Sequence, residues 1–424
     1  MKNLSTRDSN VIWHPYTQAK LAGETPGIVR GSGAILEDEN GNQYIDAISS
    51  WWVNIHGHAH PLLAESLARQ ASTLEHVIFA GFTHEPAVQL AEKLLEVLPG
   101  RQSKIFYSDN GSTAVEVAVK MALQYWKNKG RARNKIIALE HAYHGDTFGA
   151  MSVSARGLFT DPFSGLLFDV LRLPFPDAAN RDQSIQALKK IIHDHKDEIA
   201  ALIVEPLVLG AGGMLMYDKS VLENWFQVCR DNGILIMADE VMTGFGRTGT
   251  LFACDQVEST PNIICLSKGL TGGMMPLGAT SCTQEIFDAF YSEDRGKTFF
   301  HGHSYTANPL ACAVASTSLE LLLKKECQQQ IARIEKRHQE FLQSNRLPVN
   351  FQNRRHTGTI LALDWHSGEE DSYLHPIRDR LYQHCIQHGV LLRPLGNTVY
   401  VLPPYCITDD QLDKVYEVIS NFNS

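Results

Sequence analysis

The stretch from Ile234 to Gly273 constrains the fold of this chain more than any other. Two short apolar runs in it, Ile234–Ala238 and Ile263–Leu266, are typical of buried strands. The first run leads into Asp239 and the second into Lys268. Because ligands of a parallel α/β sheet bind just beyond the carboxyl ends of its strands, we expect both ionisable side chains beside a ligand.

A lysine and a carboxylate at two strand ends meet the needs of one cofactor, pyridoxal phosphate. A lysine amine captures the aldehyde of that cofactor as a Schiff base, and a carboxylate keeps the ring nitrogen protonated. Lys268 suits the first role and Asp239 the second. Taken singly, each has a plainer interpretation, since lysines are common on surfaces and Asp often caps helices. Their joint placement at two strand ends favours a pyridoxal-phosphate site over these plainer interpretations.

A glycine-containing turn earlier in the chain is expected to bind an anion. Gly111 and Ser112 precede an expected helix at 113–127, in which Thr113 and Glu116 are spaced as a capping box. Free backbone N–H groups and the helix dipole favour a phosphate at such a turn. We therefore predict that Gly111 and Ser112 hold the cofactor phosphate, although Gly-Ser at a helix start is also common as a simple cap.

Two further side chains follow expected strands. Tyr143 comes after a strand at 135–139 and is placed either to stack on the cofactor ring or to pack in the core. Glu205 puts another carboxylate at a strand end, after 200–204. The other expected elements are strands at 104–108 and 277–282, helices at 61–71, 86–98, 184–195, 221–232 and 308–323, a long surface loop at 155–183 and a flexible loop at 209–213.

The two ends of the chain differ from this alternating pattern. Asn40-Gly41 separates two short strand-like runs and predicts a hairpin. After about residue 325 a charged helix at 328–344 leads into strands near 358–363, a helix at 375–388, and strands at 391–394 and 398–402. We predict three parts: an N-terminal arm at 1–54 that belongs to the small domain, a large cofactor-binding domain at 55–324, and a small α+β domain at 325–424.

Composition excludes several classes of function. The net charge of −9 argues against a nucleic-acid partner, which requires a basic surface. No apolar run is long enough for a bilayer, and the N-terminus lacks the apolar core of a signal peptide. The eight cysteines lack C-x-x-C spacing, so we expect buried reduced thiols, no metal site and a cytoplasmic location.

The opening stretch resembles the signature of the class III, fold-type I aminotransferases. The matching residues are A-D-E-V-M-T-G-F-G-R-T-G at 238–249 and P-N-I-I-C-L-S-K-G-L-T-G-G at 261–273, with Asn262 where the family usually has Asp. The resemblance covers nearly the whole chain. It implies a pyridoxal-phosphate enzyme of the α/β class, with a mostly parallel sheet in the large domain and a smaller α+β domain.

Several other stretches resemble one branch of that family. They are W-H-P-Y at 13–16, S-W-W-V-N-I-H-G-H at 50–58, A-L-Q-Y-W at 122–126, Y-H-G-D-T-F-G-A-M-S-V at 143–153 and R-P-L-G-N-T-V-Y-V-L-P-P-Y at 393–405. This branch transfers an amino group from S-adenosylmethionine to 7-keto-8-aminopelargonate, a step of biotin biosynthesis. The resemblance therefore implies these two small-molecule substrates.

The resemblance also implies roles for individual residues. Lys268, Asp239 and Tyr143 would be catalytic, and Gly111, Ser112, His303 and Ser304 would join them in binding the cofactor. Tyr16, Trp51, Gly302 and Arg393 would line the substrate pocket, with Arg393 holding the substrate carboxylate. The turn with Ser304 would reach across a two-fold interface, so a homodimer with composite sites is expected. His303-Ser304 replaces the usual Pro-Thr, and Leu209 replaces a usual Gln.

Two other functions compete with this interpretation. Another class III aminotransferase would act on ornithine, 4-aminobutyrate or a β-amino acid, with a 2-oxo acid acceptor. The pair Trp51-Trp52 and the block around Arg393 argue against that choice. A cofactor-sensing regulator built on the same fold would need a DNA-binding module, and this acidic chain has no spare N-terminal domain for one.

Overall fold

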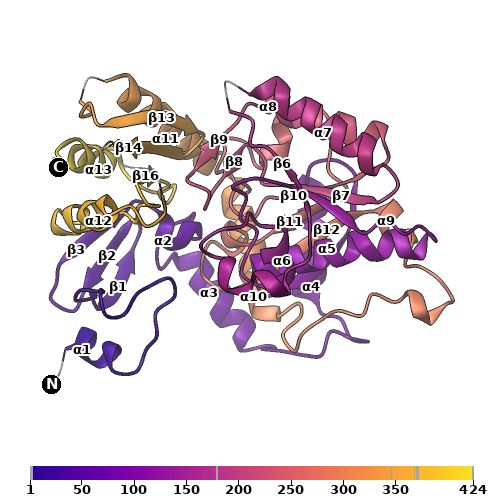
Figure 1. Ribbon diagram of the computed structural model, residues 1–424. Coiled ribbons are helices and arrows are strands. Elements are labelled where there is room, and N and C mark those ends of the chain that lie inside the picture. The colour runs from indigo at the N-terminus through magenta and orange to yellow at the C-terminus, as the bar shows by residue number, and fades with distance from the viewer. Residues whose placement is uncertain (1–2, 178–179, 345, 367, 369–371, 423–424) are drawn as a thin grey trace.

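A mixed seven-stranded sheet forms the centre of the larger part of the molecule, on the right in Figure 1. The computed structural model describes residues 3–177, 180–344, 346–366, 368 and 372–422. In sheet order the strands are β4 (Gln102–Ser108), β12 (Gly278–Thr283), β11 (Ile263–Leu266), β10 (Leu235–Asp239), β7 (Ile199–Val204), β5 (Lys135–Leu139) and β6 (Leu171–Leu173). Only β12 runs against its neighbours in this sheet, so the predicted α/β class with a mostly parallel sheet is confirmed.

The register of the sheet brings the two key strand ends together. β10 and β11 are parallel neighbours, and Asp239 lies opposite Cys265. Lys268 follows three residues after Cys265, at the same edge of the sheet. Adjacent strands therefore hold Asp239 and Lys268 at the carboxyl-end edge of the sheet, which is the edge where such sheets bind ligands.

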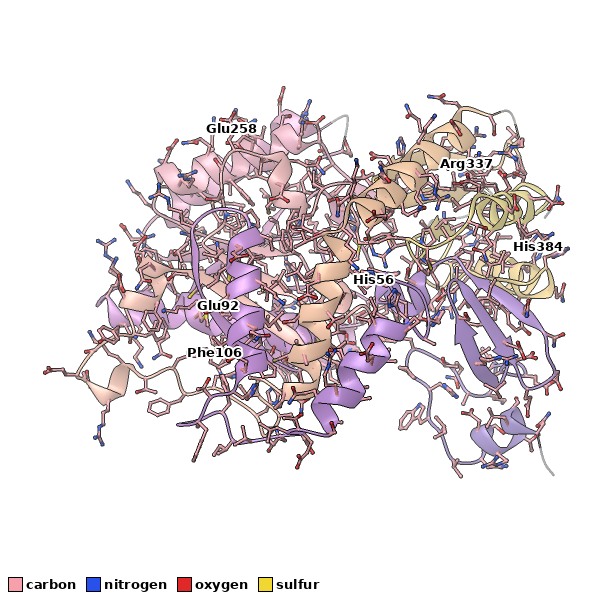
Figure 2. The ribbon with its side chains drawn as sticks, turned by 180° about the vertical axis from the view of Figure 1, so that it is seen from behind. His56, Glu92, Phe106, Glu258, Arg337 and His384 are labelled. Atoms are coloured by element: carbon pink, nitrogen blue, oxygen red, sulfur yellow. The ribbon has the colours of Figure 1, made fainter. Side chains whose placement is uncertain are left out.

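Helices cover both faces of the sheet because its strands are apolar on both sides. In β5, Ile137 and Leu139 enter one core, while Ile136 and Ala138 enter the other. The second core contains α5 (Gly111–Asn128), α6 (Phe148–Val153) and α9 (Gln284–Asp288). The first contains α4 (Glu85–Val97), α7 (Arg181–His195), α8 (Lys219–Asp231) and α10 (Pro309–Leu322), and α3 (Pro61–Ala71) packs on α10. Figure 2 shows α4, which carries Glu92, beside α10.

Two smaller sheets lie on the left in Figure 1, and the four-stranded one joins the two ends of the chain. The predicted hairpin at Asn40-Gly41 is confirmed, since β2 and β3 pair as antiparallel neighbours around it. One sheet contains β1 (Ile28–Ser32), β2 (Ile35–Asp38), β3 (Gln43–Asp46) and β15 (Val390–Leu391), and the other β13 (Phe351–Thr357), β14 (Ile360–Trp365) and β16 (Thr398–Val401). The domain boundaries at 54/55 and 324/325 stay a prediction. The accompanying helices are α1 (Leu4–Ser9), α2 (Ser49–Trp52), α11 (Lys325–Gln343), α12 (Ile377–Gln387) and α13 (Asp409–Ser420).

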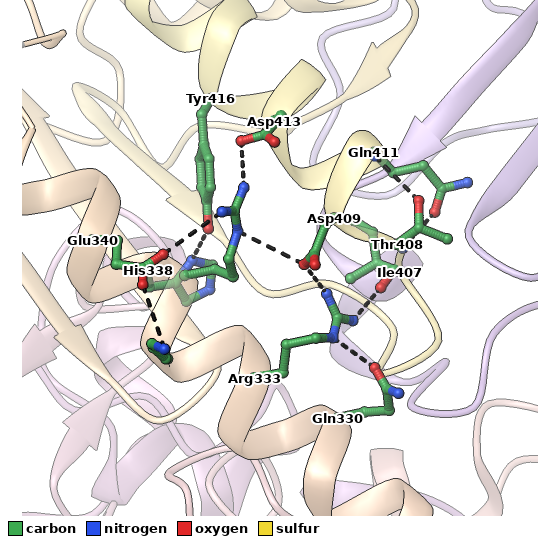
Figure 3. A network of polar contacts seen from close by, with 12 residues as sticks. Gln330, Arg333, His338, Glu340, Ile407, Thr408, Asp409, Gln411, Asp413 and Tyr416 are labelled. Atoms are coloured by element: carbon green, nitrogen blue, oxygen red, sulfur yellow. Dashed lines mark hydrogen bonds and ion pairs between the residues drawn. The ribbon is translucent and has the colours of Figure 1, made fainter.

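Polar contacts fasten α11 to α13 (Figure 3). Arg333 pairs with Asp409 and Arg337 with Asp413 at the exposed rim. Beneath them His338 is fully buried, with Nδ1 2.8 Å from the Tyr416 hydroxyl and Nε2 3.0 Å from a backbone carbonyl oxygen. Burial lowers the pKa of His338 to about 3, so this histidine is neutral at physiological pH and acts as part of the core.

The start of α5 corrects the predicted helix and its cap. The helix begins at Gly111, and its cap is Asn110, whose side chain accepts a hydrogen bond from the Thr113 backbone N–H at 3.0 Å. The proposed capping box of Thr113 with Glu116 is therefore wrong. Glu116 instead accepts hydrogen bonds from the backbone N–H groups of Gly149 and Ala150, at the start of α6.

Two predicted loops are more ordered than their composition indicates, and one predicted strand is shorter than expected. The predicted loop at 155–183 contains a 3-10 helix, η1 (Asp161–Leu166), and the edge strand β6, while residues 178–179 lie outside the described residues. The predicted flexible loop at 209–213 begins in β8 (Val208–Leu209), which pairs with β9 (Leu215–Met216) and buries Leu209 completely. The strand predicted at 391–394 is only β15, and its partner is β3. Short 3-10 helices complete the described chain: η2 (Ala253–Gln256), η3 (Lys268–Thr271) and η4 (Arg295–Lys297).

The structure also tests the expectation of buried thiols and the expectation that no segment crosses a membrane. All eight cysteines are free, and six are buried, but Cys327 is half-buried and Cys406 is exposed. The expectation of buried thiols is therefore wrong for Cys406. None of the helices in the described part of the chain has the length and apolar character needed to cross a membrane.

Candidate active site

A cavity of about 710 Å³ opens at the carboxyl ends of the central strands. It brings together eight of the residues predicted for the site: Tyr16, Trp51, Gly111, Ser112, Tyr143, Asp239, Lys268 and Arg393. Gly302, His303 and Ser304 do not line it, and Gly302 and Ser304 are exposed. A single chain thus assembles the predicted lysine, aspartate and arginine in one space, without the turn at 301–305.

Lys268 sits just past the end of β11, in a left-handed backbone conformation with φ of 47°. Its Nζ lies 4.7 Å from the centre of the Trp52 ring. Burial lowers the pKa of Lys268 to about 8, although the carboxylates of Asp239 and Glu205 act in the opposite direction. Roughly a tenth of this amine is therefore neutral at pH 7, far more than for an ordinary lysine, and a nucleophile or a proton carrier requires the neutral form.

A buried histidine orients Asp239. His144 Nδ1 lies 2.7 Å from Asp239 Oδ2, and the backbone N–H of Val241 donates to Oδ1 at 3.1 Å. Both side chains are nearly inaccessible to solvent, and His144 Nε2 has no partner among the described residues. Asp239 thus presents a fixed carboxylate to the cavity. His144 was not predicted, although its position five residues after an expected strand was a usable signal.

Glu205 ties together two loops at the cavity wall. Its Oε1 accepts a hydrogen bond from the Tyr143 backbone N–H at 2.9 Å, and its Oε2 accepts one from Gly210 at 2.9 Å. Burial, with a further contribution from Asp239, raises the pKa of the Glu205 carboxyl to about 7. The predicted carboxylate at this strand end therefore fixes the loop that carries Tyr143.

The start of α5 forms a narrow cradle at the other side of the cavity. A Cβ added at Gly111 would lie 2.6 Å from Cγ1 of Val241, so only glycine fits there. Ser112 Oγ lies 2.8 Å from Thr147 Oγ1 and accepts the Thr147 backbone N–H at 3.0 Å. The helix N-terminus therefore meets the cavity with backbone close by, an arrangement that suits a phosphate group.

Aromatic side chains and one carboxylate form the outer wall. The hydroxyl of Tyr16 lies 3.0 Å from that of Tyr143 and also donates to Asp146. Burial, with the Asp146 hydrogen bond, raises the pKa of Tyr16 to about 12. Trp51 packs edge-on to Tyr16, with ring centres 5.5 Å apart, and the Arg393 guanidinium lies 4.5 Å from the Trp51 ring. Sequence reasoning missed Asp146, which directly follows the predicted Tyr143 loop.

These groups fit pyridoxal phosphate. Lys268 supplies an amine of lowered pKa, Asp239 a buried carboxylate for the ring nitrogen, and the Gly111 cradle a site for the phosphate. The sheet and the donor set together define a pyridoxal-phosphate enzyme of fold type I.

The chain belongs to the class III aminotransferases, whose family model matches residues 21–422. It is 49% identical to the adenosylmethionine-8-amino-7-oxononanoate aminotransferase of Synechococcus elongatus, over 97% of each chain. It is 41% identical to the protein of the same name from Geobacter sulfurreducens, over 96% of this chain and 94% of that one. The cofactor of this family, and of this chain, is pyridoxal phosphate.

Solved structures agree with this assignment. The adenosylmethionine-8-amino-7-oxononanoate aminotransferase of Methanocaldococcus jannaschii superposes with a TM-score of 0.93 at 35% identity, over 98% of each chain. An omega transaminase of Pseudomonas jessenii in complex with PMP superposes with a TM-score of 0.92 at 27% identity, over 99% of this chain and 97% of that one.

Proposed function

We propose that this enzyme transfers an amino group from S-adenosylmethionine to 7-keto-8-aminopelargonate (8-amino-7-oxononanoate), giving 7,8-diaminopelargonate for biotin biosynthesis. The observation that carries the proposal is the pairing of two cations with two adjacent indoles in one cavity. Lys268 lies over Trp52 and Arg393 over Trp51. An acceptor with its carboxylate far from its carbonyl carbon needs such a pair, because a guanidinium binds carboxylates with two parallel hydrogen bonds. The names of the curated relatives support the same choice.

Each residue of the site has a defined task in this proposal. When bound, the cofactor would supply an electron sink and a carrier for the amino group between the two half-reactions. Asp239, oriented by His144, keeps a proton on the ring nitrogen. The Lys268 amine carries a proton to and from the reacting carbon, which its lowered pKa permits. Tyr143 covers the ring, and the start of α5 at Gly111 and Ser112 holds the phosphate.

We further propose a homodimer with composite sites. Gly302, His303 and Ser304 do not line the cavity of their own chain, so in this proposal they serve the cavity of a second copy. Large apolar side chains are exposed near that turn: Phe300 is 77% exposed and Tyr305 65%. Sedimentation at high dilution tests the dimer, and an active cofactor-saturated monomer would exclude it.

We also propose a cytoplasmic location. The eight free thiols support this location, because reducing compartments preserve free thiols.

A half-reaction tests the substrate assignment. The cofactor-loaded enzyme is mixed with S-adenosylmethionine alone, and the absorbance of the bound cofactor is followed. We expect this donor to convert the cofactor, and added 7-keto-8-aminopelargonate to restore it. Ornithine, 4-aminobutyrate and a β-amino acid serve as comparison donors. Conversion by one of these donors but not by S-adenosylmethionine would favour another class III aminotransferase.

Arg393 provides a second, independent test of the acceptor. Arg393→Ala should weaken acceptor binding by roughly 2–5 kcal/mol, the range for removing one partner of a buried charge pair, or about 30-fold or more in affinity. Esterifying the acceptor carboxylate should weaken binding to the wild type and matter far less in the variant. Simple addition of the two losses, or a lowered melting temperature with unchanged acceptor kinetics, would rule out the direct pair.

A further inference from the structure

The short element α2 has a strained backbone. Ser49, Ser50 and Trp52 have φ angles of 50°, 60° and 69°, in the region that side chains other than glycine rarely adopt. Such conformations persist only where the surroundings impose them, and they concentrate at functional sites. Figure 1 shows α2 between the small sheets and the larger part of the molecule.

Asp46, at the end of β3, imposes this conformation from one side. Its carboxylate accepts the backbone N–H of Ser50 at 2.7 Å and 2.9 Å and the Ser50 hydroxyl at 3.1 Å. It also accepts the Ile48 backbone N–H at 3.2 Å, and His58 Nε2 lies 2.8 Å from Oδ2. Asp46 is completely buried, and its partners Ser50 and His58 are partly buried, so these contacts have little exposure to water and form one rigid unit.

Three contacts fix the turn from the other side. The Ser49 hydroxyl donates to the Leu402 carbonyl at 2.9 Å. The indole N–H of Trp52 donates to the Tyr400 hydroxyl at 3.0 Å, and the Trp52 carbonyl accepts from Arg247 at 3.1 Å. The turn is therefore anchored at its start by Ser49 and at its end by Trp52.

The strained turn places two neighbouring indoles in the same cavity. Successive side chains of a regular strand point to opposite faces, yet Trp51 and Trp52 both line the same cavity. One indole lies 4.5 Å from the Arg393 guanidinium and the other 4.7 Å from the Lys268 amine. The strand that leads to Arg393 is β15, and it pairs directly with β3, where Leu391 lies opposite Asp46. One pair of strands therefore positions both the turn and the guanidinium.

We propose that Asp46 and the strained turn Ser49–Trp52 determine which chain length of acceptor the enzyme uses. They hold the separation between the Lys268 amine and the Arg393 guanidinium constant, and so select acceptors by the number of carbons between carbonyl and carboxylate. The inference rests on the proposed function, in which the acceptor carries a distal carboxylate. Asp46 does not line the cavity and is a positioning residue, which acts through the two indoles.

The test compares Asp46→Asn with the wild type on a homologous series of unbranched ω-oxo acids, with S-adenosylmethionine as donor. One methylene in a fitted pocket changes kcat/KM by about tenfold or more, so the wild type should show a sharp optimum of chain length. Asn keeps the shape but offers one acceptor oxygen in place of two, so the turn relaxes. We expect the preference between neighbouring chain lengths to fall to about threefold or less.

Matched variants separate this effect from general damage. Asp364→Asn makes the same chemical change at an acid of β14 that pairs with Arg355 and Thr398 and has no hydrogen bond to the turn among the described residues, so it should keep the sharp optimum. Ser49→Ala removes the hydroxyl that anchors the turn to the Leu402 carbonyl, and should flatten the optimum as Asp46→Asn does. Cofactor absorbance and melting temperature show that each variant is folded. If Asp46→Asn does not fold, Ser49→Ala decides the question.

Two results would overturn the inference. A variant that lowers kcat/KM by one common factor at every chain length, with the optimum as sharp as before, shows that Asp46 supports the fold and selects nothing. A wild type without any preference for chain length would show that the enzyme does not bind the acceptor carboxylate at a fixed distance from the reacting carbon. That result would also contradict the proposed acceptor. The first result leaves the proposed function standing, and the second does not.

Discussion

The buried carboxyl of Glu205 gives the sharpest prediction about stability. Burial raises its pKa from the ordinary 4.5 to about 7, so the native state holds this proton more tightly than the unfolded chain. A raised native pKa stabilises the fold fully below pH 4.5, and this contribution is lost as the pH rises to about 7. Each unit between the two pKa values corresponds to 1.36 kcal/mol, so the loss is about 3 kcal/mol.

Glu205→Gln should remove this pH dependence. Glutamine stays neutral, but it offers one acceptor oxygen to the two backbone N–H groups of Tyr143 and Gly210. That defect lowers stability by about 1–3 kcal/mol at every pH. The wild type should therefore lose its advantage over the variant progressively between pH 4.5 and pH 8, by about 3 kcal/mol in all.

Urea unfolding of the cofactor-free protein across this pH range measures the difference. Titrating groups away from Glu205 contribute equally to both proteins and cancel. Glu92→Gln is the matched control, because Glu92 is exposed on α4 and its loss should leave a constant difference. A difference between wild type and Glu205→Gln that does not change with pH would refute the reasoning, since it would mean that Glu205 titrates alike in both states.

Three further predictions concern the cofactor site. Lys268→Ala should fold yet lose several orders of magnitude of activity, and borohydride should no longer fix the cofactor to the protein; attachment at another lysine would contradict the assignment. Asp239→Asn should lower the pKa of the ring nitrogen by about 1–3 units, and unchanged single-turnover rates would show that another residue faces that nitrogen. Cofactor capture by the cofactor-free protein should accelerate about tenfold per pH unit and level off above the Lys268 pKa of about 8; a rate independent of pH between 6 and 8 would exclude a buried amine.

The sequence predicts those parts of the fold that depend on local pattern. The strands Lys135–Leu139 and Ile263–Leu266 and the helix Pro61–Ala71 have the predicted bounds. Each is almost entirely apolar or begins at a proline, and such signals need no distant partner. The adjacency of Asp239 and Lys268 followed from one rule about strand ends.

The residues that orient the site depend on contacts between distant segments. His144 meets Asp239 from 95 positions away, and the Trp52 indole donates to Tyr400 across 348. No local pattern encodes such pairs. The cap of α5 is different, because a local signal was present: Asn110 precedes Gly111, and asparagine is among the preferred cap residues. The prediction that Thr113 caps the helix was therefore wrong for a reason that the sequence itself contains.

The pairing of β3 with β15 has a consequence for biosynthesis. Ile45 lies opposite Val390, so the edge of β3 has no partner until nearly the whole chain has left the ribosome. At about 5–20 residues per second, the newly made hairpin waits on the order of tens of seconds with an open edge, a template for pairing with other chains. Expression should therefore depend on chaperones more strongly than the stability of the finished enzyme suggests. Slower elongation would prolong the exposure and lower the soluble yield.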